Sequence, residues 1–330
     1  MSASEMIAAV VNEANGPFVL VQAPRPVAAA GEVLVRVHAS GVNPLDTKIR
    51  AGAAAHARHE LPAILGIDLA GSIVAIGDGV TGFAVGDEVF GMTGGVGGIQ
   101  GSLAEYAAVD ARLIAPKPAN LSMRQAAALP LAVITAWEGL VDRARVGAGQ
   151  RVLVQGGAGG VGHVAIQLAR AYGAQVFATG TAKDGEIITG FGATAIDFQA
   201  EDVLDYVARL TDGEGFDIVY DTVGGATLDA SFVAARRFGH VVSALGWGTH
   251  ALGPLSFKGG TYSGVFTLLP LLTGAGREHH GKILRAAAAL AEAGKLVPRL
   301  HPHSFSLETV GDAHAMVTAR QATGKIVIDI

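Results

Sequence analysis

The stretch 152–184, VLVQGGAGGVGHVAIQLARAYGAQVFATGTAKD, constrains the fold more than any other part of the chain. It consists of an apolar run, a glycine cluster, an amphipathic segment and a second apolar run. Short apolar runs bounded by turn residues predict buried strands, and the segment between them has helical periodicity. The stretch therefore predicts a β-α-β unit, whose two strands lie parallel in one sheet.

The glycine cluster of this stretch fits the pattern G-x-G-x-x-G. In that pattern the first glycine permits a tight turn and the second lets the backbone approach a pyrophosphate. The third lets the helix pack closely on the sheet. The helix N-terminus then offers N–H groups and positive dipole charge to the phosphates. A purely structural glycine turn is the alternative. The expected dinucleotide-binding turn comprises Gly157, Ala158, Gly159, Gly160, Val161 and Gly162.

The end of the second apolar run bears on which dinucleotide is bound. NAD-binding proteins of this kind usually place an acidic residue about 20 residues further on, where it binds the ribose 2′-hydroxyl. Here the run QVFAT is followed by Gly180, Thr181 and Lys183. A hydroxyl and an ammonium can bind a 2′-phosphate, which a carboxylate would repel. The pattern favours NADP (NADPH) over NAD, with the adjacent Asp184 as the opposing feature.

Three regions of the chain differ in their residue pattern. Residues 1–125 hold short alternating segments broken by Gly and Pro, which predict an antiparallel barrel or sandwich. Residues 126–265 alternate between strand and helix patterns, which predicts an α/β domain with a parallel sheet. Residues 266–330 end in the strand-like GKIVIDI, which resembles the first region, so we expect them to complete the first domain. The expected strands of the second region are 151–155, 175–179, 193–197, 216–221 and 240–245, and the expected helices are 161–172, 200–210 and 226–237.

Composition excludes several classes of protein. The chain has no cysteine, so it has neither a disulfide nor a thiolate ligand or nucleophile. With a net charge of -5 and no basic block, nucleic acid is not an expected partner. The longest apolar run, 126–137, is too short to span a bilayer, and the first residues lack the features of a signal peptide. We therefore expect a cytoplasmic protein without a membrane partner.

Three motifs resemble those of the medium-chain dehydrogenase/reductase superfamily, in particular its zinc-independent quinone oxidoreductase branch. They are ASGVNPLDTKIRAG at 39–52, GDGVTGFAVGDEVFG at 77–91 and LPLAVITAWEGL at 129–140. The resemblance covers nearly the whole chain. It implies a GroES-like β-barrel domain, a Rossmann domain with a doubly wound parallel sheet, and an active site in the cleft between them. It also implies that the C-terminus returns to the barrel domain.

The resemblance also bears on metal content. Zinc-containing members hold the metal with a Cys, with the His of a Gly-His-Glu motif, and with a further Cys or Asp. This chain has Asn43 at the first of these positions and Ile67 at the second. Since a catalytic zinc needs three protein ligands, we expect no metal. The histidines of AHARHE at 55–60 and the glycine-rich 91–101 are interpreted as loops, the latter close to a site.

The family resemblance also implies roles for individual residues. Asn43 and Thr135 are expected at the nicotinamide end of the cleft, where Asn43 donates to the acceptor oxygen or orients the cofactor. Asp46 is expected to fix the loop that carries Asn43. Phe198 takes the place of a tyrosine that touches the 2′-phosphate in relatives, and Arg320 and Lys325 lie where relatives contact the cofactor or close the domain.

The expected activity is reduction of a quinone or an α,β-unsaturated carbonyl by NADPH, because such acceptors take hydride without a Lewis acid. The alternatives are an NADP-binding protein with a structural or sensor role and, less favoured, an alcohol dehydrogenase. The apolar segment 260–266 is the expected last strand of the sheet. An open sheet edge leaves backbone N–H and C=O groups unpaired and able to pair with another chain. We therefore expect a homodimer that covers this edge.

Overall fold

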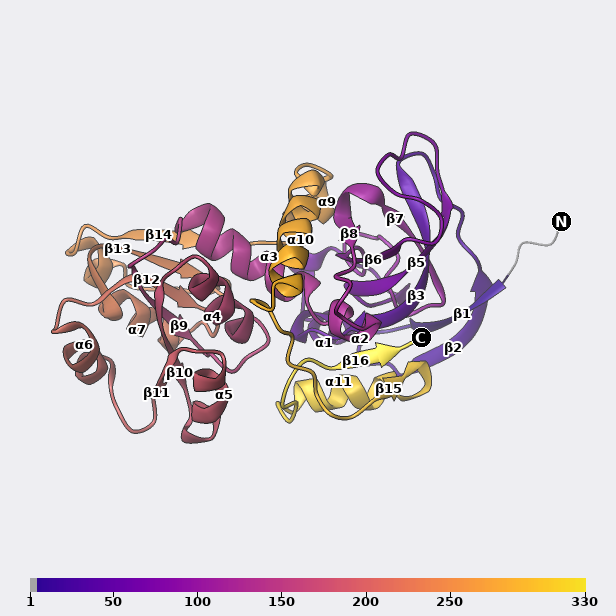
Figure 1. Ribbon diagram of the computed structural model, residues 1–330. Helices are drawn as coiled ribbons and strands as arrows, with labels where there is room; N and C mark the ends of the chain where they lie inside the picture. The colour runs from indigo at the N-terminus through magenta and orange to yellow at the C-terminus, as the bar shows by residue number, and fades with distance from the viewer. Residues whose placement is uncertain (1–4) are drawn as a thin grey trace. The chain divides into compact units, whose positions relative to one another are not determined.

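The strand–helix alternation of the second region forms a six-stranded parallel sheet (Figure 1). The computed structural model describes residues 5–330. The strand order is β11-β10-β9-β12-β13-β14, which is 3-2-1-4-5-6 when the strands are numbered within the sheet. This is the doubly wound Rossmann order, in which ligands bind at the carboxyl ends of the strands where the order reverses. The predicted Rossmann sheet is confirmed.

The elements of this region follow the predicted pattern closely. The strands are β9 Arg151–Gln155, β10 Gln175–Gly180, β11 Thr194–Asp197, β12 Phe216–Asp221, β13 Ala235–Ser243 and β14 Thr261–Gly264. The helices are α3 Pro130–Trp137, the π-helix η3 Glu138–Arg143, α4 Gly162–Ala171, η4 Ala182–Asp184, α5 Gly185–Gly190, α6 Val203–Thr211, α7 Ala226–Ala234 and α8 Gly253–Ser256. Helices α4 and α7 pack on the central strands, and apolar side chains such as Leu153, Phe177 and Val219 form the core.

Several predicted boundaries in this region are wrong. Helix α6 begins at Val203 rather than at 200, because the Asp202 carboxylate accepts hydrogen bonds from the N–H groups of Leu204 (2.8 Å) and Asp205 (3.0 Å) and caps the helix there. Helix α7 ends at Ala234 rather than at 237. Strand β13 starts directly after it, at Ala235 rather than at 240, and ends at Ser243 rather than at 245. The pairing of β13 with β12 shifts register after Ala235, so a bulge absorbs residues that were assigned to the helix.

The other strands form a three-stranded sheet, β2-β1-β4, and a seven-stranded sheet, β15-β16-β3-β5-β6-β8, in which β7 also pairs with β3. The strands are β1 Glu5–Val11, β2 Phe18–Pro24, β3 Glu32–Gly41, β4 Ala63–Ile64, β5 Asp68–Ile76, β6 Glu88–Met92, β7 Tyr106–Asp110, β8 Ile114–Pro116, β15 Phe305–Ser306 and β16 Val327–Asp329. The helices are α1 Pro44–Arg50, η1 Ala55–Ala57, η2 Ala111–Leu113, α2 Met123–Ala127, α9 Leu269–Thr273, α10 Arg277–Glu292, η5 Leu307–Thr309 and α11 Val310–Thr318. The predicted alternation at Val33, Val35 and Val37 packs into one buried cluster with Leu69 and Ile73.

The C-terminal strand β16 joins the sheet that the N-terminal region builds. It pairs antiparallel with β3 through residues 39–41, and in Figure 1 this yellow strand lies among the indigo and purple ones. β7 occupies the first half of the same edge of β3, at residues 32–36. Residues far apart in the chain therefore complete one strand edge, and the backbone N–H of Val42 donates to the carbonyl of Ile326 (2.9 Å).

The chain divides into two compact units. The first contains the described residues up to Leu131, together with Leu268–Gly294 and Pro298–Ile330. The second contains Ala132–Thr267 and Lys295–Val297 and is built on the Rossmann sheet. Among residues 5–330, no helix is long and apolar enough to cross a membrane.

Candidate active site

The glycine turn lies between β9 and α4, at the carboxyl end of a central strand of the Rossmann sheet. A Cβ at Gly162 would lie 2.0 Å from the carbonyl oxygen of Gly156, and one at Gly157 would lie 2.6 Å from the side chain of Ala178. The protein itself therefore requires these two glycines. At Gly159 the nearest contact of a Cβ would be 3.2 Å away, so packing forbids a side chain there less strictly. This arrangement fits a dinucleotide, whose pyrophosphate needs an uncovered backbone at the second glycine.

A buried polar network supports the start of this turn, and the sequence pattern did not reveal it. The Thr179 side chain accepts a hydrogen bond from the N–H of Gly156 (3.0 Å) and donates one to Oε1 of Gln155 (2.7 Å). The carbonyl oxygen of Thr179 accepts from the N–H of Gly157 (2.8 Å). The neighbouring strand β10 thus holds the backbone of the first glycine in place.

The predicted cofactor residues after β10 gather at the same end of the sheet. Gly180 pairs with Asp197 at the ends of β10 and β11, and the N–H of Phe198 donates to the carbonyl of Gly180 (3.2 Å). The Phe198 side chain is 56% exposed, and Lys183 is exposed and forms no hydrogen bond or ion pair within residues 5–330. Both side chains are therefore available to a ligand at this edge.

Thr181 does not offer the hydroxyl proton that the sequence analysis assigned to a phosphate. Both its N–H and its Oγ1–H donate to Oδ2 of Asp184, each at 2.8 Å. Asp184 thereby caps the short helix η4, and its carboxylate is turned toward the Thr181 backbone. Lys183 is left as the cationic group that could distinguish a 2′-phosphate from a hydroxyl.

Thr135 belongs to the second unit and lies at the end of α3, just before the π-helix η3. Its carbonyl oxygen accepts a hydrogen bond from the buried Tyr220 hydroxyl (2.7 Å). A Cβ at Gly139 in η3 would lie 2.7 Å from the Tyr220 ring, so this ring and the π-helix are fitted to each other. π-Helical segments often occur at functional sites.

Asn43 lies in the first unit, at the N-terminus of α1, and is 1% exposed. Its Nδ2 donates to Oδ2 of Asp68 (3.0 Å), and its Oδ1 accepts from the Lys325 ammonium. Its backbone N–H donates to Oδ2 of Asp46 (2.8 Å), as expected of a residue that fixes this loop. The structure therefore brings Asn43 and Asp46 together with Lys325, which the family resemblance placed near the cofactor or at the closure of the domain, and with Asp68, which the sequence analysis did not single out.

Burial controls the ionisation of this cluster. It raises the pKa of Asp46 to about 7, against the hydrogen bond from Asn43. Burial also raises the pKa of Asp68 to about 6, against the Lys325 charge and the hydrogen bonds from Asn43 and Leu131. The pKa of Lys325 is lowered by burial, against the two carboxylates. Within residues 5–330, Oδ1 of Asp46 is buried and has no hydrogen-bond partner, so it is the oxygen at which a proton would lie.

Asp68 and Lys325 leave a recognisable signal in the sequence. Asp68 stands in the apolar run LGIDLAGSIV, and Lys325 immediately precedes the apolar IVIDI. A charged residue within a buried strand pattern needs a partner of opposite charge. Spacing alone could not show that these two charges meet each other at Asn43.

Arg320, Lys48 and Ile67, which the sequence also singled out, belong to the first unit. Arg320 belongs to the first unit and follows α11 with a φ of 56°. Lys48 is exposed on α1. Ile67 is fully buried, and residues 5–330 contain no group of three His, Asp or Glu side chains arranged to hold a metal ion.

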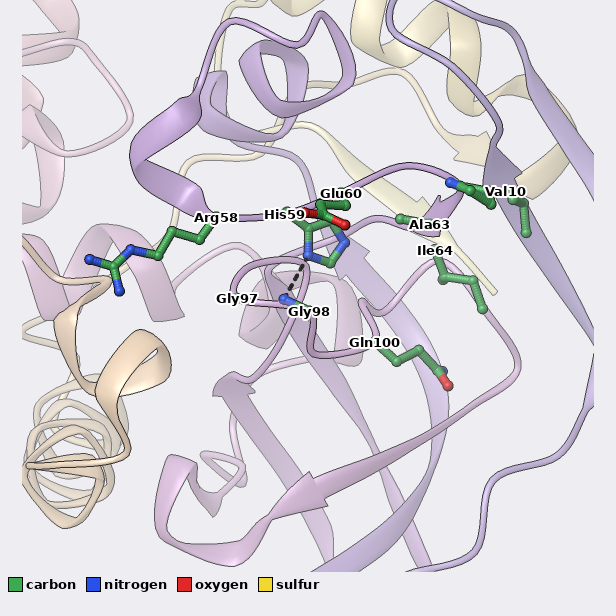
Figure 2. A pocket seen from close by; sticks show the side chains of 10 residues that line it. Val10, Arg58, His59, Glu60, Ala63, Ile64, Gly97, Gly98 and Gln100 are labelled. Carbon is green, nitrogen blue, oxygen red and sulfur yellow. Dashed lines mark hydrogen bonds between the residues drawn. The ribbon is translucent and has the colours of Figure 1, made fainter.

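The loops 55–60 and 91–101 meet in the first unit. They contribute to a pocket of about 560 Å³ with β4 and the end of β1, and Figure 2 shows His59 beside Gly97 and Gly98. The N–H of Gly98 donates to Nδ1 of His59 (3.2 Å), so a neutral His59 carries its proton on Nε2. Burial lowers the pKa of His59, which favours this neutral form.

Two family models match parts of the chain. Residues 29–119 match the alcohol dehydrogenase GroES-like domain family, and residues 191–328 match the zinc-binding dehydrogenase family. Over 98% of its length, the chain superposes on 99% of an alcohol dehydrogenase superfamily protein from Novosphingobium aromaticivorans, with 61% identity and a TM-score of 0.97.

Three curated relatives are similar over most of the chain. It is 37% identical to 2-methylene-furan-3-one reductase of Solanum lycopersicum, over 90% of the chain and 71% of that protein. It is 35% identical to the chloroplastic NADPH-dependent alkenal/one oxidoreductase of Arabidopsis thaliana, over 90% of the chain and 72% of that protein. It is 32% identical to quinone oxidoreductase of Sus scrofa, over 92% of the chain and 90% of that protein.

The chain therefore belongs to the medium-chain dehydrogenase/reductase superfamily, as its motifs indicated. Within it, the chain falls in the zinc-independent branch of the quinone oxidoreductases and alkenal/one reductases, and it is an NAD(P)-dependent oxidoreductase. The predicted combination of a GroES-like domain with a Rossmann domain is confirmed.

Replacing Asp46 with Asn should stabilise the protein at high pH. The folded-state pKa of Asp46, about 7, is raised above the usual aspartic acid pKa of 3.8, so wild-type stability from this group falls as pH rises from about 4 to about 7. We expect Asp46→Asn to be more stable than wild type at pH 8, by up to about 4 kcal/mol at about 1.4 kcal/mol per pKa unit, and equal to it near pH 4. Urea unfolding across this pH range measures the difference, with the exposed Asp78→Asn as control. A variant less stable than wild type at pH 8 would contradict the prediction.

Proposed function

We propose that the protein reduces a C=C bond conjugated to a carbonyl, or a quinone, with NADPH and without a metal. The observation that carries this proposal is the 35–37% identity to two reductases whose names specify conjugated carbonyl substrates. The exposed, unpaired Lys183 at the edge of the cofactor sheet supports NADPH as the donor. The Ile at position 67 and the absence of cysteine support chemistry without zinc.

Reduction of an enone needs little covalent help from the protein. When bound, NADPH supplies the hydride. The β-carbon of the acceptor gains this hydride, the π electrons move onto the carbonyl oxygen, and water protonates the α-carbon. The task of the protein is then to align the two reactants and to stabilise the negative charge on that oxygen.

Asn43 and Thr135 are the residues we assign to this task. An amide N–H of Asn43 is a suitable donor to the developing negative charge, and the Lys325 ammonium on its Oδ1 strengthens that donor. Tyr220 holds the Thr135 backbone in place, which fits a residue that orients the nicotinamide ring. The glycine turn, in which Gly159 is less obstructed than Gly157 and Gly162, takes the pyrophosphate.

Two other functions would retain some of these features. An NADP-binding protein with a structural or sensor role needs the glycine turn and Lys183 but not the charge cluster at Asn43. An alcohol dehydrogenase needs a group that lowers the pKa of the substrate hydroxyl, and residue 67 cannot ligate a metal.

A substrate screen tests the proposed activity. Purified protein with NADPH should reduce short and long enones or quinones, and exhaustive chelation should leave the rate unchanged. NADPH oxidation followed by absorbance, with product identification, is the measurement. Tight NADPH binding without turnover of any acceptor would instead favour the sensor role. Stoichiometric zinc whose removal abolishes activity would favour an alcohol dehydrogenase.

Lys183→Ala should weaken NADPH binding more than NADH binding. A charge-assisted hydrogen bond is worth about 1.5–3 kcal/mol, so we expect Kd for NADPH to rise by about 10- to 150-fold and Kd for NADH by much less. Fluorescence titration of both cofactors measures this. Lys295→Ala, which removes an exposed lysine elsewhere in the same unit, is the control. Equal losses for the two cofactors would exclude a role in NADP selection.

We also propose that the protein is a homodimer formed through β14. This strand ends the Rossmann sheet, Phe238 on β13 is 78% exposed, and Phe257 just before β14 is 93% exposed. An unpaired edge beside exposed aromatic rings favours an interface. Light scattering at micromolar concentration should give the dimer mass, and Phe238→Glu should shift it toward the monomer. Val27→Glu, at an exposed site in the other unit, should not. A monomer mass for the wild type would refute this interface.

A further inference from the structure

We propose that Lys325 is a positioning residue that sets the orientation of the Asn43 amide and thereby directs an N–H of that amide, rather than its oxygen, toward the acceptor. This rests on the proposed function, because Asn43 is assigned there to the reacting oxygen. The two faces of an amide side chain have nearly the same shape, so hydrogen-bond partners alone decide which atom points where.

The two charged neighbours of Asn43 select the same orientation. An ammonium can only donate, so the atom next to Lys325 must be Oδ1. An ionised carboxylate can only accept, so the atom that faces Asp68 must be Nδ2. A flipped amide would place a donor against a donor and an acceptor against an acceptor. In the observed orientation one N–H of Nδ2 is used by Asp68, and the second remains to be directed at a ligand.

Lys325 is held firmly enough to impose this orientation. Its side chain is nearly fully buried, and its ammonium also donates to the carbonyl of Val42 (3.2 Å). Its backbone N–H donates to Arg299 (2.8 Å), and its carbonyl accepts from His301 (2.9 Å). At the preceding Gly324, a Cβ would lie 2.7 Å from the backbone of Leu300, so only glycine lets the chain approach so closely.

The contact with Lys325 also changes the amide electronically. A cation on the oxygen of an amide withdraws electron density from its nitrogen and makes the N–H groups better donors. Asn43 is buried, where such polarisation is screened less than in water. Lys325 therefore strengthens the interaction with a developing oxyanion without touching the acceptor.

The test compares Lys325→Met with Lys117→Met. Lys117 is a matched control, because it is also nearly buried in the first unit, donates to the carbonyls of Pro118 (3.1 Å) and Leu121 (2.6 Å), and lies 3.2 Å from the carboxylate of Glu88. We expect Lys325→Met to lower kcat by at least about tenfold. This loss should be smaller than the loss in kcat of about 10²–10³-fold that follows removal of a whole oxyanion donor. KM for NADPH should stay within about twofold of wild type, since the glycine turn is untouched. Lys117→Met should retain the wild-type kcat.

A second readout does not depend on turnover. The chain has four asparagines, so ¹⁵N-asparagine labelling gives a small set of side-chain amide signals. The two side-chain N–H signals of Asn43 should change chemical shift and exchange faster with solvent in Lys325→Met but not in Lys117→Met. If Lys325→Met does not fold, Lys325→Gln takes its place in both readouts, because a glutamine amide carries no positive charge and can either donate or accept, so it no longer imposes an orientation on Asn43.

The outcomes separate this inference from the proposed function. A folded Lys325 variant with unshifted Asn43 signals or with wild-type kcat would overturn the inference, as would an equal loss in Lys117→Met. A wild-type protein that reduces no enone or quinone would refute the proposed function, and the Asn43 signals would still decide whether Lys325 orients the amide.

Discussion

The first unit depends on one buried electrostatic contact, between the Lys325 ammonium and the Asn43 amide beside Asp68. A charge without a partner in a dry interior costs several kcal/mol, so the members of this cluster require one another. They come from the loop after β3, the start of β5 and the segment before β16. The conformation of the loop that carries Asn43 therefore depends on contacts with the C-terminal segment and with a strand of the barrel.

The second unit depends on a steric constraint. Gly157 and Gly162 let the turn after β9 close against β10 and against its own backbone, and the Thr179 network fixes where that turn begins. Neither constraint requires a metal. A hydride acceptor that is already electrophilic needs alignment and hydrogen-bond donors, and rigid backbone and buried charge can provide both.

Strong local patterns predicted much of this architecture. The glycine spacing, the strand–helix alternation and the strand-like C-terminus led to the Rossmann sheet and to most of its elements within a few residues. The errors arose where side chains competed with periodicity. Asp202 capped α6 later than the apolar pattern suggested, and a bulge after Ala235 took residues from α7 into β13. At Thr181 the expected hydroxyl donor was already used by Asp184, which a linear motif does not reveal.

The sequence by itself determined the class of fold and the dinucleotide turn, because these follow from residue types at short, regular spacing. It named Asn43 and Thr135 as candidates only through its resemblance to a known family. Only the tertiary structure decided which charges act together. Lys325 and Asn43 are 282 residues apart, and their contact exists because β16 pairs with the end of β3. Local periodicity contains no information on such a pairing. The orientation of the Asn43 amide therefore follows from strand topology, since it is set by a lysine from the far end of the chain.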